Sequence, residues 1–196
     1  ALNDAWLKSA LEELLEDLRK NLSALRFEHV LSTTETAISL GRTHQANEII
    51  LQVSGYLHDF AREMPVKKQE EILKSEGLED PIALENPVLH HAKVAAILGK
   101  QRYGFPDKWV EPAKWHTTGR AKMTLEDVIL YVSDQIEPKR AWSTERLLDE
   151  AHTNLSLSFK NCLLQKLEFT LKRGKMVHPD SIQCWNWLCL GNSWAD

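Results

Sequence analysis

The sequence predicts an all-α fold in one domain, on three observations. Apolar residues recur three and four positions apart in most segments, as on one face of a helix. No stretch alternates apolar and polar residues as a half-buried strand does. The chain has 196 residues, an ordinary length for one domain, and no linker divides it. We therefore expect a single helical domain over residues 1–196.

Five helices are expected in the first 103 residues. The first carries leucines at helical spacing with charged residues opposite: Leu7, Leu11, Leu14, Leu15 and Leu18. Gly41 and Gly77 are expected to end two later helices, whereas Asn86-Pro87 is a typical helix start. The expected ranges are 4–20, 23–40, 46–60, 66–76 and 86–103, with a loop over 78–85.

Five further helices are expected in the rest of the chain, over 107–116, 124–137, 143–152, 154–173 and 179–190. Pro112 falls inside the first of these and should bend it or mark its first turns. Thr124 and Asp127 have the spacing of a capping box, and Pro138 should end that helix. The tryptophans of the tail favour packing or an interface over stacking on a base: Trp185, Trp187 and Trp194.

Composition excludes several classes of protein. The 24 basic and 28 acidic residues give a net charge of −4, which argues against a nucleic-acid partner. No apolar run approaches the roughly 18–20 residues of a membrane helix, so no membrane partner is expected. The charged N-terminus is unlike a signal peptide. Three cysteines without a CxxC pair (Cys162, Cys184 and Cys189) indicate a reducing, cytoplasmic setting.

Common catalytic motifs are missing from the sequence. The eight glycines are scattered and form no phosphate-binding loop, so a P-loop or Rossmann nucleotide site is excluded. There is no Gly-x-Ser-x-Gly motif, and no cysteine has the surroundings of a nucleophile. The chemistry must therefore depend on other side chains that project into a helical bundle.

Histidine and aspartate are the candidates. His58-Asp59 ends an apolar segment, and four more such residues lie on or beside separate expected helices: His29, His91, His116 and Asp134. Imidazole and carboxylate groups suit Fe, Mn, Co or Zn. Spacing alone leaves a metal site and ordinary histidines about equally favoured. His44, His152 and His178 belong to no such group of histidines and aspartates, and we interpret them as surface residues. Of His90 and His91, only one is expected to face inward.

Four segments of the chain resemble one enzyme family. They are residues 26–29 (Arg-Phe-Glu-His), 58–65 (His-Asp-Phe-Ala-Arg-Glu-Met-Pro), 115–120 (Trp-His-Thr-Thr-Gly-Arg) and 133–138 (Ser-Asp-Gln-Ile-Glu-Pro). In these segments the chain resembles the HD-domain metal-dependent phosphohydrolases, and more narrowly the bacterial symmetrical bis(5′-nucleosyl)-tetraphosphatases. Residues 171–175 and 178–181 extend the resemblance to the tail. Residues 116–120 together with 134–138 are highly specific to this branch.

The resemblance implies an HD-type helical bundle with a dinuclear metal site. The metal core would cover residues 23–140, and further helices would cover 143–191. The implied cofactors are two divalent transition-metal ions, usually iron. One ion would be held by His29, His58, Asp59 and Asp134, and the other by Asp59, His91 and His116, with Asp59 bridging. His91 is preferred to His90 because Val94 and Ala96 then keep the family's spacing.

The implied activity is cleavage of diadenosine tetraphosphate into two ADP by a hydroxide that bridges the metal ions. Asp59, Arg62 and Arg120 would be catalytic, since guanidinium groups bind phosphates. Substrate contacts would come from Arg62, Thr117, Thr118, Arg120, Glu137 and Arg140. The partner would be a dinucleoside polyphosphate or another nucleotide, and the family also suggests a homodimer. Residues 141–144 depart from the family, which affects substrate contacts of that loop but none of the six ligands.

Two alternative activities stay open on the same fold. One is hydrolysis of another nucleotide, as a phosphatase or phosphodiesterase, and the other is a di-iron oxygenase. The specific blocks at 116–120 and 134–138 favour the tetraphosphatase branch over both. A metal-binding regulator without activity is disfavoured, because no expected ligand is missing.

Overall fold

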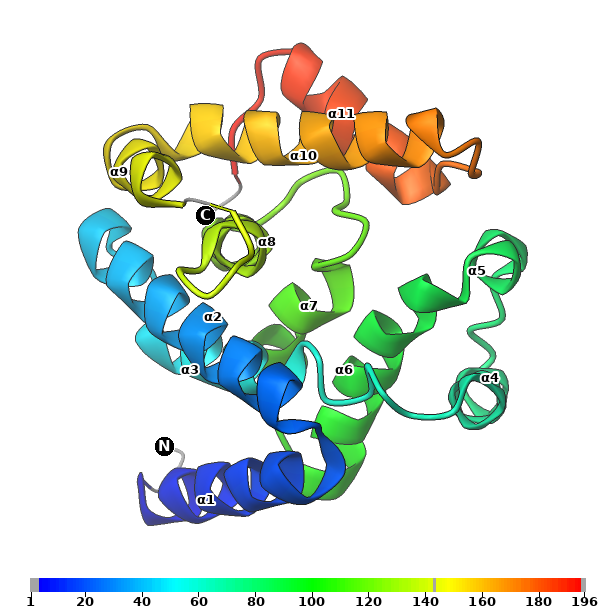
Figure 1. The fold of residues 1–196 in the computed structure, drawn as a ribbon. Coiled ribbons are helices and arrows are strands. Elements are labelled where there is room, and N and C mark those ends of the chain that lie inside the picture. Colours follow the sequence, from blue (N-terminus) through cyan, green and yellow to red (C-terminus); the bar gives the residue numbers. More distant parts are fainter. Residues whose placement is uncertain (1–3, 143, 195–196) are drawn as a thin grey trace.

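The computed structural model describes residues 4–142 and 144–194, and its regular elements there are helices (Figure 1). In chain order they are α1 (Asp4–Asn21), α2 (Ala24–His44), α3 (Glu48–Leu57), α4 (Val66–Ser75), α5 (Pro81–Glu85), the 3₁₀ turn η1 (Pro87–Leu89), α6 (His90–Tyr103), α7 (Asp107–Trp115), α8 (Leu125–Ile136), α9 (Glu145–Thr153), α10 (Leu155–Lys172) and α11 (Pro179–Cys189). The predicted all-α class is confirmed. Among the described residues, no helix is long and apolar enough to cross a membrane.

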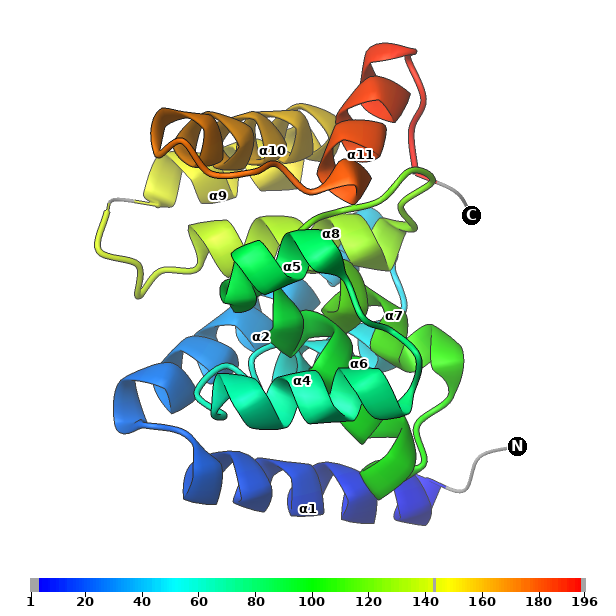
Figure 2. The same cartoon turned by 90° about the vertical axis from the view of Figure 1, so that its right-hand side faces the viewer.

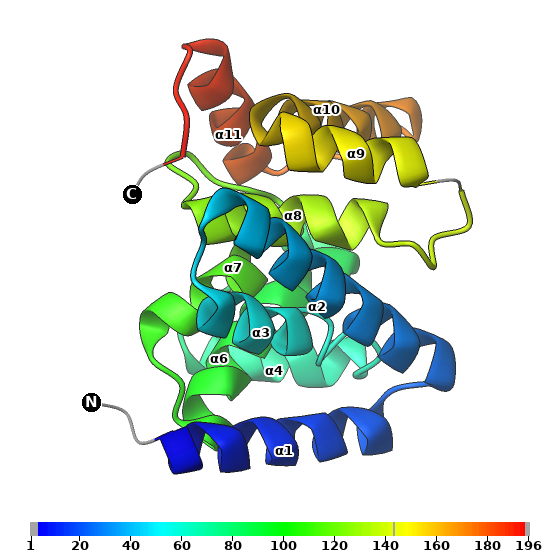
Figure 3. The same cartoon turned by 90° about the vertical axis from the view of Figure 1, so that its left-hand side faces the viewer.

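The helices pack around two apolar clusters that lie one above the other (Figure 1). The lower cluster joins α1, α3, α6 and α7, and buries residues such as Leu14, Leu57 and Val94. The upper cluster joins α8 to α11 with the far end of α2, and includes the tail tryptophans 185, 187 and 194. These tryptophans therefore pack against the core, as expected. Helices α2, α3, α7 and α8 connect the two clusters (Figure 3).

Side-chain caps begin the helices that carry the site. The Ser23 hydroxyl accepts a hydrogen bond from the Arg26 amide at the start of α2, and Asn47 caps α3. At α8, the Thr124 hydroxyl and the Asp127 carboxylate each accept from the other's backbone amide. The predicted capping box is therefore confirmed. These caps set where each helix starts, and thus which residues lie at its ends.

Several expected boundaries were wrong. Gly41 does not end α2, which continues to His44 and stops at Gln45, a residue in the left-handed conformation (φ 60°). The expected loop over 78–85 contains α5, because Asp80 caps it and Pro81 suits its first position. The helix expected from residue 86 begins as the 3₁₀ turn η1. Pro112 lies inside α7, as expected, in its second turn. Ser143, the expected start of the next helix, lies outside the described residues.

His178 is buried rather than on the surface, with 9% of its area exposed. Its Nδ1 accepts from the Asp180 amide at the start of α11, so Nε2 carries the proton. That Nε2 donates to Asp80 Oδ2 over 2.5 Å. Lys93 Nζ lies 3.5 Å from the same oxygen. The pair ties the segment before α11 to α5, which lies below it in Figure 2.

Replacing Asp80 should destabilise the protein in a pH-dependent way. Burial alone would raise the pKa of Asp80, but the hydrogen bond from His178 and the Ala83 amide lower it to about 2, from 3.8. A carboxylate with a lowered pKa stabilises the fold above its unfolded pKa, and this is lost as the pH falls through the folded value. Asp80→Asn, which can still cap α5, should lower the free energy of unfolding by about 2 kcal/mol at pH 6.

Urea unfolding of both proteins at a series of pH values measures this effect. The deficit of Asp80→Asn should be full at pH 5–6 and shrink between about pH 4 and pH 2. A deficit that is the same at pH 6 and pH 2 would show that the charge of Asp80 does not stabilise the fold.

Candidate metal centre

The six predicted metal ligands meet between the two apolar clusters. His29 lies in the second turn of α2, and Asp134 in the last turn of α8. His58 and Asp59 directly follow α3, His91 lies in the first turn of α6, and His116 directly follows α7. All six are buried, with at most 9% of any residue exposed. The ends of five helices thus bring the six side chains together.

Hydrogen bonds orient the four imidazoles in the same way. His58, His91 and His116 each direct Nδ1 to the carbonyl oxygen three residues earlier, over 2.6, 2.6 and 2.7 Å. A carbonyl only accepts, so Nδ1 carries the proton and Nε2 of the neutral ring keeps a free lone pair. Nδ1 of His29 donates to Glu137 Oε1 over 3.1 Å. All four Nε2 atoms therefore face the centre, as in histidines that ligate a metal.

The two carboxylate oxygens of Asp59 face different pairs of histidines. Oδ2 lies 3.5 and 3.7 Å from Nε2 of His29 and His58. Oδ1 lies 3.1 and 3.6 Å from Nε2 of His91 and His116. These contacts define two donor groups that share Asp59, and each could hold a metal ion.

Asp134 belongs to the first group. Its Oδ1 lies 2.9 Å from His29 Nε2 and 3.6 Å from His58 Nε2. In the second group, Nε2 of His91 and of His116 lie 3.1 Å apart. Two lone pairs at this distance repel each other unless a cation lies between them. The donors therefore fit a pair of metal ions.

The pKa shifts of Asp59, Asp134 and His116 also favour a cation, whereas the two carboxylates outweigh burial and raise the pKa of His58. Burial alone would raise the pKa of Asp59, but His58, His116 and His91 hold it well below its usual range. Asp134 follows the same pattern: burial opposes ionisation, and the neighbouring His29 and His58 hold its pKa low. Burial lowers the pKa of His116 to about 4. Ionised carboxylates and a neutral imidazole are the forms that bind metals.

Three charged side chains surround this centre. Arg26 donates from Nη1 to Asp59 Oδ2 over 2.8 Å, and Arg140 from Nη2 to Asp134 Oδ1 over 2.9 Å. Glu137 holds His29 from behind and accepts from the Lys139 amide over 2.7 Å. Glu137 and Arg140, expected to contact substrate, thus contact metal ligands. Sequence reasoning missed a role for Arg26, although it lies one turn before His29 on α2.

The structure does not bring Arg120 to the six ligands. Its guanidinium pairs with Asp127 over 2.8 Å and Glu111 over 3.2 Å, and it lies over the Trp115 ring. Asp127 is in the first turn of α8, whereas Asp134 is in the last, about 10 Å further along the helix. The expected catalytic role of Arg120 stays a prediction, which would require it to leave these carboxylates.

A cavity of about 560 Å³ is lined by Thr117, the residue after His116, but by none of the six expected ligands. Arg62 and Thr117, two of the expected substrate contacts, line it. Thr118 lies beside a smaller pocket instead, with its hydroxyl on the Gly119 carbonyl. Among the described lining residues, four carry a positive charge and none a carboxylate: Arg62, Lys166, Arg173 and Lys175. The volume is typical of a small-molecule site.

His90 and His91 are both buried, contrary to the expectation that only one would face inward. His91 joins the metal centre, whereas His90 turns toward α4, where its Nε2 lies 3.7 Å from Glu70. Because α6 packs against neighbours on two sides, adjacent residues of it can both be covered. The preference for His91 as the ligand agrees with this geometry.

Comparisons with known proteins agree with this centre. The family model described as "HD domain" matches residues 26–139. The chain is 30% identical to the symmetrical bis(5′-nucleosyl)-tetraphosphatase of Bacillus subtilis (strain 168), over 92% of this chain and 98% of that protein. It is 28% identical to the protein of the same name from Staphylococcus aureus, over 86% and 89% of the two chains.

A solved structure shares the fold. It is described as a predicted HD superfamily hydrolase involved in NAD metabolism, from Clostridium acetobutylicum. It superposes with a TM-score of 0.87 at 28% identity, over 92% of this chain and 97% of that one. The match therefore spans both apolar clusters and not the metal core alone.

Proposed function

Because the chain belongs to the HD domain family, and within it to the branch of the symmetrical bis(5′-nucleosyl)-tetraphosphatases, we propose that it hydrolyses diadenosine tetraphosphate into two ADP. The observation that carries this proposal is the carboxylate of Asp59, whose two oxygens face two separate pairs of histidines. The chain is a metal-dependent hydrolase of phosphoanhydride bonds. The substrate, the number of ions and the bond that breaks are the parts to be tested.

The donor set supports two divalent ions, and we propose iron. His29, His58, Asp59 and Asp134 would hold one ion, and Asp59, His91 and His116 the other. When bound, such ions lower the pKa of water and neutralise a phosphate under attack. The nitrogen and oxygen donors suit iron, manganese, cobalt and zinc, and the absence of thiolates in the site argues against softer metals.

The protein's own groups position the substrate. Arg62 lines the cavity three residues after Asp59, so its guanidinium suits a phosphate beside the metal centre. Thr117 offers a hydroxyl from the residue next to His116. Arg26 and Arg140 hold the carboxylates of Asp59 and Asp134 in place. Glu137 fixes the ring of His29, since a hydrogen bond to Nδ1 sets both its tautomer and its orientation.

Symmetrical cleavage follows from where the nucleotide lies. The cavity is lined by four cationic side chains and by apolar residues that include Leu163, Leu167 and Val177. A nucleoside fits the walls, and its phosphates reach toward His116. If the second phosphate of this half lies at the metal centre, water attacks its phosphorus. The other half of the substrate then leaves as ADP. Cations, not base contacts, then set which bond breaks.

We also propose a cytoplasmic location and a homodimer. The three cysteines are free thiols, and two of them, Cys162 and Cys184, are buried, which suits a reducing compartment. The homodimer has the family resemblance as its support.

A panel of nucleotides tests the proposed function. The purified protein should be incubated with and without Fe²⁺ under anaerobic conditions, with diadenosine tetraphosphate, a nucleoside monophosphate and a cyclic dinucleotide. We expect hydrolysis of the tetraphosphate and dependence on the metal. Preferred cleavage of either of the other substrates would favour another HD nucleotide hydrolase, and oxygen consumption without phosphate release would favour an oxygenase.

A further inference from the structure

Lys166 is a cationic side chain at the inner end of the cavity that the sequence did not single out. It lies on α10 within an apolar stripe formed by Cys162, Leu163 and Leu167, all of which are buried. Its Nζ donates to the main-chain carbonyl of His116 over 3.0 Å. Helix α10 crosses the top of the molecule above α8, which carries Asp134 (Figure 1).

We propose that Lys166 binds the phosphates of the nucleoside diphosphate half that occupies the cavity. The proposal rests on the proposed function for the identity of the nucleotide, but not for the presence of a phosphate site. It adds a substrate-binding residue that lies outside the metal core and outside the expected substrate contacts.

No carboxylate of the described residues forms an ion pair with Lys166, although the charges of Asp134 and Asp59 act on it from further away. An ammonium group has three donors, and the His116 carbonyl uses one. The Tyr131 ring lies below it, with its centroid 4.2 Å from Nζ. In the described part of the chain, no carboxylate oxygen lies within 4.0 Å of Nζ. A cation with free donors that lines a cavity without carboxylates is placed to receive an anion.

Tyr131 fixes the position of Lys166. The residue is fully buried, its hydroxyl included, and the face of its ring contacts the ammonium group. The Phe159 ring holds Tyr131 in an edge-to-face contact at 5.2 Å. The ammonium group is therefore held between this ring and the His116 carbonyl, with donors left for a ligand.

The position of Lys166 favours a phosphate over other anions. Lys166 touches the backbone of His116, a ligand of the second donor group, so an anion there would lie next to the metal centre. Arg62, Arg173 and Lys175 line the same cavity, and this much positive charge suits a ligand with several negative charges. The exposed Phe169 and Met176 lie at the outer rim, where a nucleoside would follow.

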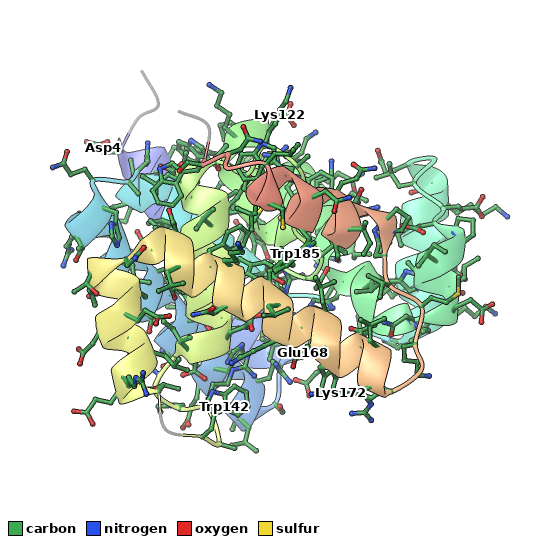
Figure 4. The ribbon with its side chains drawn as sticks, turned by 90° about the horizontal axis from the view of Figure 1, so that it is seen from above. Asp4, Lys122, Trp142, Glu168, Lys172 and Trp185 are labelled. Carbon is green, nitrogen blue, oxygen red and sulfur yellow. The ribbon has the colours of Figure 1, made fainter. Side chains whose placement is uncertain are left out.

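Binding of ADP to the metal-loaded protein, measured by calorimetry, tests the proposal. Lys166→Met removes the charge and keeps an unbranched side chain of similar length. We expect its Kd for ADP to rise about ten- to a hundredfold, as for the loss of a charge-assisted hydrogen bond. Lys166→Arg keeps the charge and should raise Kd much less. Lys172→Met is the matched control: it lies on the same helix with an exposed side chain (Figure 4) and should bind ADP as the wild type does.

Metal content and thermal unfolding separate binding from a structural role. Removing a cation from apolar surroundings should not lower the melting temperature, so Lys166→Met should keep its metal and unfold at the wild-type temperature or above it. An unchanged Kd, equal losses in Lys166→Met and Lys166→Arg, or a parallel fall in metal content would each overturn the proposal.

The outcomes separate a failure of the phosphate site from a failure of the proposed function. If the wild type hydrolyses diadenosine tetraphosphate but Lys166→Met binds ADP normally, the activity stands and the phosphate site fails. If the wild type binds ADP through Lys166 but releases no ADP from the tetraphosphate, the phosphate site stands and the proposed substrate fails.

Discussion

Asp59→Ala is expected to remove nearly all hydrolysis of diadenosine tetraphosphate, and to remove more of it than His29→Ala does. Asp59 faces both donor groups, so its loss disables both ion sites, whereas His29 belongs to one. The loss of a group that only orients a metal ligand typically reduces activity 10- to 100-fold, and a shared ligand should exceed this range, with a loss of more than about 100-fold. Initial rates at saturating Fe²⁺ measure the difference.

The control for this experiment is Asp149→Ala, an exposed carboxylate on α9 that should leave the rate unchanged. Metal content gives a second readout. Asp59→Ala should retain less than one ion per chain, and His29→Ala more. Equal residual rates and equal metal contents in the two variants would contradict a shared role for Asp59.

Removal of metal is expected to abolish activity and to lower the melting temperature. The centre places buried carboxylates and imidazoles together, and metal ions bound there stabilise only the folded chain. A ligand at a thousand times its Kd adds about 4 kcal/mol to the free energy of unfolding. Treatment with a chelator followed by calorimetry measures the change, and anaerobic addition of Fe²⁺ should restore both stability and activity.

Asp59→Ala serves as the control for metal removal, because a variant that binds little metal should lose little stability to the chelator. An identical melting temperature for chelated and metal-loaded wild type would show that the centre does not bind metal tightly. Activity that survives complete metal removal would contradict a metal-dependent mechanism.

Periodicity and helix caps were sufficient to predict most of the fold. The leucine pattern of α1 and the capping box at Thr124 are local signals, and both agree with the structure. Local signals failed where contacts between residues distant in sequence determine the structure. The hydrogen bond from His178 to Asp80 joins residues 98 positions apart, so neither the burial of His178 nor the anchoring of α5 was readable. Gly41 suggested a helix end, but α2 continues through Gly41, which packs against Leu51.

That the six expected ligands lie together was predictable for a different reason. They are histidines and aspartates beside apolar segments, and the resemblance assigned all six to one metal centre. The surrounding charges were harder, because arginine is frequent on surfaces and its partners are distant in sequence. Arg120 was expected at the phosphates but pairs with Glu111 and Asp127. Lys166 was overlooked, although a lysine within the apolar stripe of α10 was a readable signal.

The products of diadenosine tetraphosphate hydrolysis in ¹⁸O-labelled water test the proposed activity most directly. The metal-loaded protein should release ADP as the only nucleotide, and the label should appear in one of each two ADP molecules, because one water attacks one phosphorus. ATP and AMP in equal amounts would contradict symmetrical cleavage and would place the metal centre at a different phosphorus from the one proposed.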